Sequence, residues 1–274
     1  MTDVIASPRN PLFRLVKGLD AEAECRRREG LFLLWGARFV EEAMQDRSRV
    51  ARLIVGESLS RQTSVRPLLR LSQQLDIPVS VFADRLLEDL APGASDQGLL
   101  TLARARREPL GPLLGRSHCR VLLIADRIQD PGNLGVLVRL AEASQVTAVV
   151  PLRGTVDPFN TRAARASAGS ILRVAIADPP SKGDWDGILR EHHLRVVVSL
   201  ARDGVPLQQA DLTGPLALVV GNEGEGVGAR WVDSADLRVT IHLGGKVESL
   251  NVSSAAAILL YEAFRQRAAV RSSG

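Results

Sequence analysis

The chain has 274 residues, of which 45% are hydrophobic and 24% are charged, a balance typical of a folded globular protein. No apolar run approaches the length of a bilayer span, and residues 1–10 have no apolar signal core, so we expect a cytoplasmic protein that has no membrane partner. The formal net charge of +4 suits a polyanionic partner such as nucleic acid, although many proteins without such a partner are equally basic.

The first part of the chain alternates predicted helices and strands. It begins with a cationic helical stretch over residues 9–28. Strands are predicted at 31–35, 50–55, 78–82 and 99–103, and helices at 37–45, 65–75 and 84–90. This alternation indicates a small α/β domain over residues 1–107, which could fold alone. Residues 108–118 are rich in Arg, Pro and Gly and fit neither period, so we expect a linker there.

From residue 119 onward the pattern changes to short apolar runs separated by helical stretches. The runs lie at 121–125, 148–150, 171–174, 195–198, 216–220 and 237–241. Runs of this kind are typical of a parallel sheet that is covered on both faces. Helices are predicted at 134–144, 160–167, 183–191 and 252–267. The sequence therefore predicts a second α/β domain over residues 119–274.

No group of residues in this sequence has the spacing of a metal site. Cys25 and Cys119 are far apart and match no disulfide framework, so we expect both to be reduced. His192 and His193 are adjacent at the end of a predicted helix, where we expect a surface feature and not a pair of ligands.

The first of three candidate clusters is DRIQDPGNLG, residues 126–135, directly after a predicted strand. Its DPG sequence predicts a tight turn, and Asn133 fits the N-cap of the next helix. This places the loop at the carboxyl edge of the sheet, where ligands of open α/β folds bind. Arg139 is expected to reach back over Gly135 toward Asn133. A capped helix with one surface arginine is an equally good interpretation of this cluster alone.

The second cluster is GNEGEGVG, residues 221–228, which follows the strand predicted at 216–220. Four glycines allow the backbone to approach a ligand closely and to adopt positive φ. The spacing fits neither a Walker A loop nor the dinucleotide fingerprint. Glu223 and Glu225 would repel a phosphate but suit a cationic ligand or hydroxyl and amine groups. A flexible turn with solvated acids explains this loop, viewed alone, equally well.

The third cluster is IHLGGKVESLNVS, residues 241–253, in which a strand leads through two glycines into a helix. Asn251 is a candidate N-cap, and the small residues at 253–257 allow another backbone to pass close by. A well-capped terminal helix is the better interpretation of this cluster alone. The apolar face of the helix comprises Val252, Ala256, Leu259, Leu260 and Ala263.

Together, the stretches DPGNLGVLVRLAEAS, ALVVGNEGEGV and IHLGGKVESLNVS resemble the three motifs of the SpoU (TrmH) family of RNA 2′-O-ribose methyltransferases, in the family's order. RASAGSILRV, residues 165–174, resembles the segment between the first two motifs. NPLFRLVKGL and LFLLWGARFVEEAM resemble, more loosely, the family's N-terminal substrate-binding domain. The resemblance implies a small α/β/α RNA-binding domain and a C-terminal parallel-sheet α/β-knot (SPOUT, trefoil knot) domain, in which S-adenosylmethionine is bound bent.

The resemblance also assigns residues to roles. The catalytic or substrate-positioning places are occupied by Asn133, Arg139, Glu223, Ser249 and Asn251. The places near the cofactor are occupied by Val220, Gly221, Gly226, Ile241, Leu243, Leu250 and Val252. The cations of the first helical stretch, expected to bind RNA, are Arg14, Lys17, Arg26, Arg27 and Arg28. The family is dimeric with an active site completed across the interface, and we expect the apolar face of the terminal helix to form that interface.

The chemistry that the resemblance implies is a methyl transfer to a ribose 2′-oxygen, which requires in-line alignment and a weakened hydroxyl proton. A guanidinium normally stays protonated, so we expect Arg139 to bind the target phosphate and polarise the hydroxyl. Asn133 and Asn251 would orient Arg139 and the ribose, and Glu223 would fix their hydrogen bonds or accept from the substrate. No metal is needed.

Ribosomal RNA is the expected substrate, with transfer RNA as the alternative, and a role in antibiotic resistance stays open. A dinucleotide-dependent oxidoreductase is disfavoured, because the sequence lacks an early glycine-rich fingerprint followed by an acid. A non-catalytic RNA-binding protein with the same fold is a further alternative. The presence of Asn133, Arg139, Glu223 and Asn251 argues against it.

Overall fold

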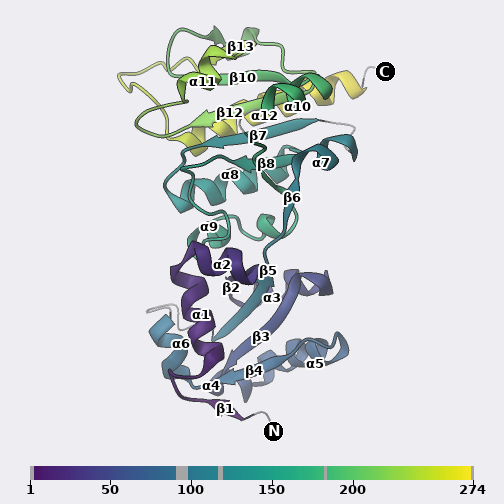
Figure 1. Ribbon diagram of the computed structural model, residues 1–274, viewed down its shortest axis with the longest axis vertical. Coiled ribbons are helices and arrows are strands. Elements are labelled where there is room, and N and C mark those ends of the chain that lie inside the picture. The colour runs from purple at the N-terminus through teal and green to yellow at the C-terminus, as the bar shows by residue number, and fades with distance from the viewer. Residues whose placement is uncertain (1–2, 91–97, 117–119, 182–183, 273–274) are drawn as a thin grey trace. The chain divides into compact units, whose positions relative to one another are not determined.

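The computed structural model describes residues 3–90, 98–116, 120–181 and 184–272 (Figure 1). The chain divides into two compact units, each described here by itself. The N-terminal unit comprises Met1–Arg106 and Phe159–Leu172, and the C-terminal unit comprises Arg107–Pro158 and Arg173–Gly274. No described helix combines the length and hydropathy that crossing a bilayer requires.

The N-terminal unit is a five-stranded mixed sheet packed with short helices. The strands follow the order β1-β4-β3-β5-β2: β1 (Val4–Ile5), β2 (Leu31–Trp35), β3 (Val50–Gly56), β4 (Val79–Phe82) and β5 (Leu99–Arg104). The helices from the first part of the chain are α1 (Pro11–Ala21), α2 (Ala23–Glu29), α3 (Ala37–Met44), α4 (Glu57–Ser60), α5 (Arg66–Gln74) and α6 (Asp84–Leu90). The expected single helical stretch is two helices, because Glu22 between α1 and α2 has an extended backbone.

Residues 159–172 come from the middle of the second predicted domain but belong to the N-terminal unit. Phe159 packs on Phe32 of β2, with ring centroids 5.1 Å apart. In α9 (Thr161–Ala166), the Thr161 hydroxyl donates to the Asp20 carboxylate over 2.6 Å. The run 171–174, expected as a strand, is partly a 3-10 turn (Ser170–Leu172) and contains no strand. Its apolar residues are buried, and a short buried run cannot be assigned by periodicity alone.

The C-terminal unit is built on an eight-stranded sheet in which the described strands pair in parallel, as predicted. The strand order is β11-β13-β10-β12-β7-β8-β9-β6. The strands are β6 (Arg107–Pro109), β7 (Val121–Asp126), β8 (Ala148–Pro151), β9 (Ile176–Asp178), β10 (Arg195–Leu200), β11 (Val205–Pro206), β12 (Leu216–Gly221) and β13 (Leu237–Thr240). The helices are α7 (Leu110–Arg116), α8 (Pro131–Ala143), α10 (Trp185–Glu191), α11 (Ala229–Asp233) and α12 (Val252–Ser272).

Both faces of this sheet are covered. On one face Ile124, Val198 and Val219 pack with Trp185 of α10 and Trp231 of α11, whose rings meet edge to face. α12 packs against α8 and β12. Because side chains alternate along a strand, the successive buried residues of β7 and β12 serve both layers.

Four expectations about individual segments need correction or completion. Residues 108–116 are not an irregular linker, since β6 and α7 lie there and Leu114 is fully buried. Residues 117–118 and Cys119 lie outside the described residues, whereas Cys25 is a free, buried cysteine. His192 is buried at the end of α10, so only His193 fits the expected surface feature.

The apolar face of α12 is a core surface and is not available as a dimer interface. Val252, Ala256, Leu259, Leu260 and Ala263 are all buried within the protomer. The exposed stripe of the same helix contains Ile258 and Tyr261, with 41% and 65% of their surfaces accessible. An amphipathic pattern identifies the buried face of a helix but not whether a second chain or the same chain covers it.

Candidate active site

The three candidate clusters meet at one edge of the C-terminal sheet. β7 and β12 are neighbours in parallel register, and their last residues, Asp126 and Gly221, are paired. β10 lies on the other side of β12, followed by β13. Since parallel strands all end at the same edge, the loops after these strands are brought together.

The glycine-rich loop folds back onto the end of β12. Asn222 forms an isolated bridge with Gly226, and its side-chain oxygen accepts from the backbone N–H groups of Gly224 (2.8 Å) and Glu225 (3.0 Å). Gly226 has a φ of 68°, which favours glycine. A Cβ on Gly221 would overlap the backbone of Gly226 and Val227. Gly221 is therefore required for a close approach within the loop itself.

Arg127 holds this loop against the loop that follows β7. Its guanidinium forms an ion pair with Glu225 and donates to the Gly226 carbonyl over 3.2 Å. In return, the Asn222 amide donates to the Arg127 carbonyl over 3.0 Å, and the Asp126 carboxylate accepts from the Gly228 N–H over 2.7 Å. The sequence suggested that Glu225 could bind a cationic ligand. In the structure its carboxylate is instead paired with Arg127 of the same protein.

The sequence predicts Asn133 as the N-cap of α8, but the N-cap in the structure is Asp130. The Asp130 carboxylate accepts from the backbone N–H of Asn133 over 2.9 Å, and Pro131 occupies the first helical position. Proline is favoured there because its missing N–H would be unpaired in any case. Asn133 consequently lies within the first turn, and its side chain is available for other contacts.

One residue from each cluster joins a hydrogen-bonded chain beside the sheet edge. The Asn133 amide donates to the Glu223 carboxylate over 2.5 Å, and its amide oxygen accepts from the Asn251 amide over 3.2 Å. The Asn251 oxygen accepts from the N–H (2.9 Å) and the hydroxyl (2.6 Å) of Ser253. Asn251 therefore caps α12, as predicted, while its other side-chain group holds Asn133.

Arg139 lies apart from this chain of hydrogen bonds. It is exposed on α8, and among the described residues it makes no hydrogen bond or ion pair with Asn133 or with the glycine-rich loop. The expected reach toward Asn133 is therefore not observed. Six residues separate the two along α8, which places them about 9 Å apart along the axis and on different sides of the helix.

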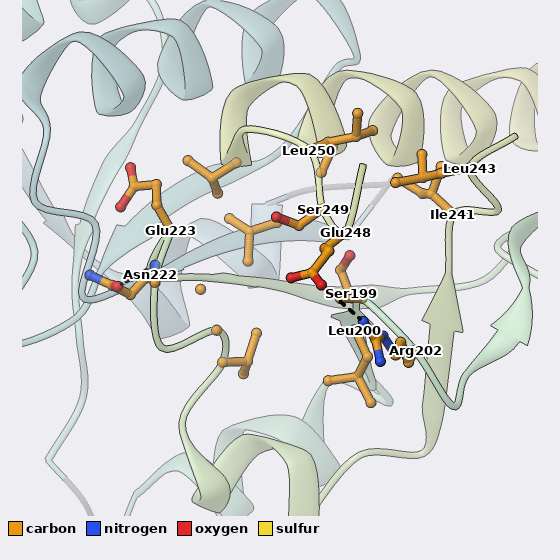
Figure 2. Close-up of a pocket in the computed structure, with 18 residues that line it drawn as sticks. Ser199, Leu200, Arg202, Asn222, Glu223, Ile241, Leu243, Glu248, Ser249 and Leu250 are labelled. Carbon is orange, nitrogen blue, oxygen red and sulfur yellow. Dashed lines mark hydrogen bonds and ion pairs between the residues drawn. The ribbon is translucent and has the colours of Figure 1, made fainter. Parts of the chain in front are cut away.

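A pocket of about 320 Å³ opens next to the hydrogen-bonded chain (Figure 2). All seven residues that the resemblance placed near a cofactor line it: Val220, Gly221, Gly226, Ile241, Leu243, Leu250 and Val252. Glu223 and Ser249 also line it, while Asn133 reaches it through Glu223. Half of the lining residues have apolar side chains, and the carboxylates of Glu223 and Glu248 are also in the lining, which suits a ligand with a flat ring and a separate positive charge.

Several lining residues were missed by the sequence analysis. They are Ser199 and Leu200 at the end of β10, Ala201 and Arg202 after it, Asn222, Gly224 and Val227 in the glycine-rich loop, Glu248 and Ala255. Arg202 and Glu248 form an exposed ion pair at 3.9 Å, drawn as a dashed line in Figure 2. The residues after β10 could have been found, because they follow a predicted buried strand of the same sheet edge.

The expected RNA-binding cations in the N-terminal unit fall into two groups. Arg26 is buried and donates to the backbone carbonyls of Leu19 (2.7 Å) and Asp20 (3.1 Å), so it serves the end of α1 and not RNA. The other four are exposed: Arg14, Lys17, Arg27 and Arg28. The hydrogen bond to Glu29 is the main cause that raises the pKa of the Arg28 guanidinium, which stays charged.

Comparison with known proteins gives a consistent result. Residues 120–261 match the SpoU rRNA Methylase family, and residues 33–109 match the RNA 2′-O ribose methyltransferase substrate-binding family. The 23S rRNA (guanosine(2553)-2′-O)-methyltransferase RlmP of Bacillus subtilis is 31% identical over 94% of this chain and 97% of that protein. The 23S rRNA (guanosine-2′-O-)-methyltransferase RlmB of Vibrio cholerae is 29% identical over 87% of this chain and 98% of that protein.

A solved structure extends the comparison to the fold. The SpoU methyltransferase AviRb of Streptomyces viridochromogenes, in complex with the cofactor AdoMet, superimposes with a TM-score of 0.80 at 26% sequence identity. The alignment covers 95% of this chain and 100% of that chain.

Proposed function

Because this chain belongs to the SpoU rRNA methylase family, we propose that it transfers a methyl group from S-adenosylmethionine to a ribose 2′-oxygen of ribosomal RNA. The observation that carries this proposal is the hydrogen-bonded chain Glu223–Asn133–Asn251 at the edge of the pocket. It draws one side chain from each of the three clusters. Relatives over most of the chain are named 23S rRNA 2′-O-methyltransferases, which favours ribosomal over transfer RNA.

The pocket suits S-adenosylmethionine in shape and charge. Apolar side chains from Val220, Ile241 and Leu250 offer walls for an adenine ring. When bound, the cofactor supplies an activated methyl group on a positively charged sulfur. Carboxylates near that charge, such as Glu223, are favourable neighbours for it.

The protein's part in the reaction is to hold the acceptor ribose in line with the methyl group. Asn133 is fixed from both sides, by Glu223 and by Asn251, so its position costs little entropy when RNA binds. Exposed amide and hydroxyl groups at Asn251 and Ser249 can orient the ribose. Arg139 binds the phosphate next to the target ribose and draws electron density from the 2′-hydroxyl, and that phosphate accepts the proton.

We further propose that the working form is a homodimer. Among the described residues, Arg139 makes no hydrogen bond or ion pair with the pocket of its own chain, so a second protomer is a natural source of the guanidinium. The exposed Ile258 and Tyr261 on α12 line a surface pocket together with Leu207 and offer apolar side chains for such a contact. We therefore propose this exposed surface as the dimer interface, in place of the apolar face of α12, which is buried within the protomer.

Three finer points belong to the same proposal. The N-terminal unit, with its inserted residues 159–172, binds RNA, the C-terminal unit transfers the methyl group, and Arg14, Lys17, Arg27 and Arg28 contact RNA phosphates. The loops after β12 and β13, both beside the pocket, form the trefoil knot. A cytoplasmic location follows from a ribosomal substrate.

The test is transfer of a labelled methyl group from S-adenosylmethionine to total RNA, followed by mapping of 2′-O-methyl sites in cells with and without the gene. One ribosomal site that depends on the gene is the expected result. A site in transfer RNA would move the substrate to that alternative. Binding of RNA without any transfer would support the non-catalytic interpretation and overturn the proposal.

A further inference from the structure

The pocket carries its charged side chains at two separate places. Glu223 is hydrogen-bonded to Asn133 at one side. Arg202 and Glu248 lie together away from it, and Figure 2 shows Glu223 and Arg202 on opposite sides of the pocket. Among the described lining residues, Arg202 alone carries a positive charge. The pocket therefore has a second polar end that offers one charge of each sign.

The ion pair at this end is poorly suited to a structural role. Its N–O separation is 3.9 Å, and the side chains of Arg202 and Glu248 are 73% and 85% exposed. Exposed pairs of this kind contribute little to stability, because water screens them and both long side chains must be ordered. Exchanging this pair for contacts with a ligand would cost the protein correspondingly little.

The charges match those of an amino acid. A free α-amino acid group carries a carboxylate and an ammonium on the same carbon, so it needs a cation and an anion close together. Arg202 and Glu248 provide that pair, on loops that follow β10 and β13. A guanidinium is also the side chain best shaped to bind a carboxylate through two hydrogen bonds.

We propose that Arg202 binds the α-carboxylate, and Glu248 the α-ammonium, of the amino-acid end of S-adenosylmethionine. The proposal rests on the proposed function, because it assigns the two ends of the same ligand. The apolar walls then take the adenosyl part, and the Glu223 side of the pocket faces the acceptor ribose. The ion pair opens when the ligand binds, and each partner gains a ligand charge in its place.

The test is calorimetric titration of the full chain with adenosyl ligands that differ only at the amino-acid end. They are S-adenosylhomocysteine, its analogue without the amino group, its analogue without the carboxylate, and 5′-methylthioadenosine, which has neither. Arg202→Met should weaken S-adenosylhomocysteine by about 10-fold and leave 5′-methylthioadenosine within about 2-fold. Arg195→Met, at the start of β10 and paired with Asp211, is the control and should change neither.

Each variant should also bind one ligand analogue more tightly than the unaltered protein does, a result that misfolding cannot produce. Arg202→Met releases Glu248, so the ligand without a carboxylate should bind more tightly than it binds the unaltered protein. Glu248→Gln releases Arg202, so the ligand without an amino group should bind more tightly. A damaged protein would bind every ligand more weakly.

The outcomes separate this inference from the function on which it rests. Equal losses for all four ligands, or no loss at all in Arg202→Met, would overturn the assignment of Arg202 and Glu248 alone. Failure of the unaltered protein to bind any adenosyl ligand would overturn the proposed function and this inference with it.

Discussion

The hydrogen bond between Asn133 and Glu223 can be tested by reversing its direction. In Asn133→Asp, a carboxylate replaces the amide that donates to Glu223 over 2.5 Å, so two negative groups face each other. A hydrogen bond to a charged group contributes about 1.5–3 kcal/mol. Its loss should lower kcat by about 10- to 150-fold, since 1.36 kcal/mol corresponds to a factor of ten. The two carboxylates can share one proton, so residual activity should increase at lower pH.

Asn133→Asp combined with Glu223→Gln restores a donor and an acceptor with the roles exchanged. The aspartate can still accept from the Asn251 amide, as Asn133 does over 3.2 Å. We therefore expect the double variant to recover most of the lost kcat and the ordinary pH profile. Binding of S-adenosylhomocysteine and the melting temperature, measured on both variants, show whether the pocket and the fold are intact.

The assay is single-turnover transfer of a tritiated methyl group to ribosomal RNA. Full activity of Asn133→Asp would refute the claim that this hydrogen bond positions the acceptor. A double variant no better than Asn133→Asp would show instead that the charge of Glu223, and not its hydrogen bond, is what the reaction needs.

Four other variants test the role of Arg139, the packing of Gly221 and the exposure of the N-terminal cations. Arg139→Ala should abolish methyl transfer while S-adenosylhomocysteine still binds in calorimetry; normal transfer would remove Arg139 from the reaction. Gly221→Ala should lower the free energy of unfolding by about 1–3 kcal/mol in denaturant melts, because its Cβ overlaps loop backbone, and an unchanged midpoint would contradict this. Neutralising Arg14 and Lys17 should reduce the slope of log RNA affinity against log salt concentration by about 2. Arg26→Ala should leave that slope unchanged and lower the melting temperature, because Arg26 is buried. The reverse pattern would contradict the burial of Arg26.

The sequence predicted those features that follow from local patterns. Buried apolar runs identified β7, β12 and β13, and each of the three candidate clusters begins at the end of one of these strands. The family's motifs then named residues that the structure brings together around one pocket. Asn251 was recognised as a cap because capping depends only on the adjacent residues.

The features that escaped prediction depend on three-dimensional contacts that the local sequence pattern does not specify. Asp130 and Asn133 are both good caps by composition, and only the position of Pro131 in the helix decides between them. Arg26 looks like its exposed neighbours in sequence, but the turn at Glu22 brings it to the carbonyls of α1. Arg202 has no motif of its own, and its place beside Glu248 follows from the sheet order.

The assignment of residues 159–172 to the N-terminal unit has a consequence for synthesis on the ribosome. When Arg106 has been made, Phe32 still lacks the ring of Phe159, and Asp20 lacks the hydroxyl of Thr161. The first unit therefore cannot complete its packing until much of the second has been translated. The two units cannot be exchanged between proteins by dividing the chain at one position, because residues 159–172 would then be separated from the N-terminal unit on which they pack.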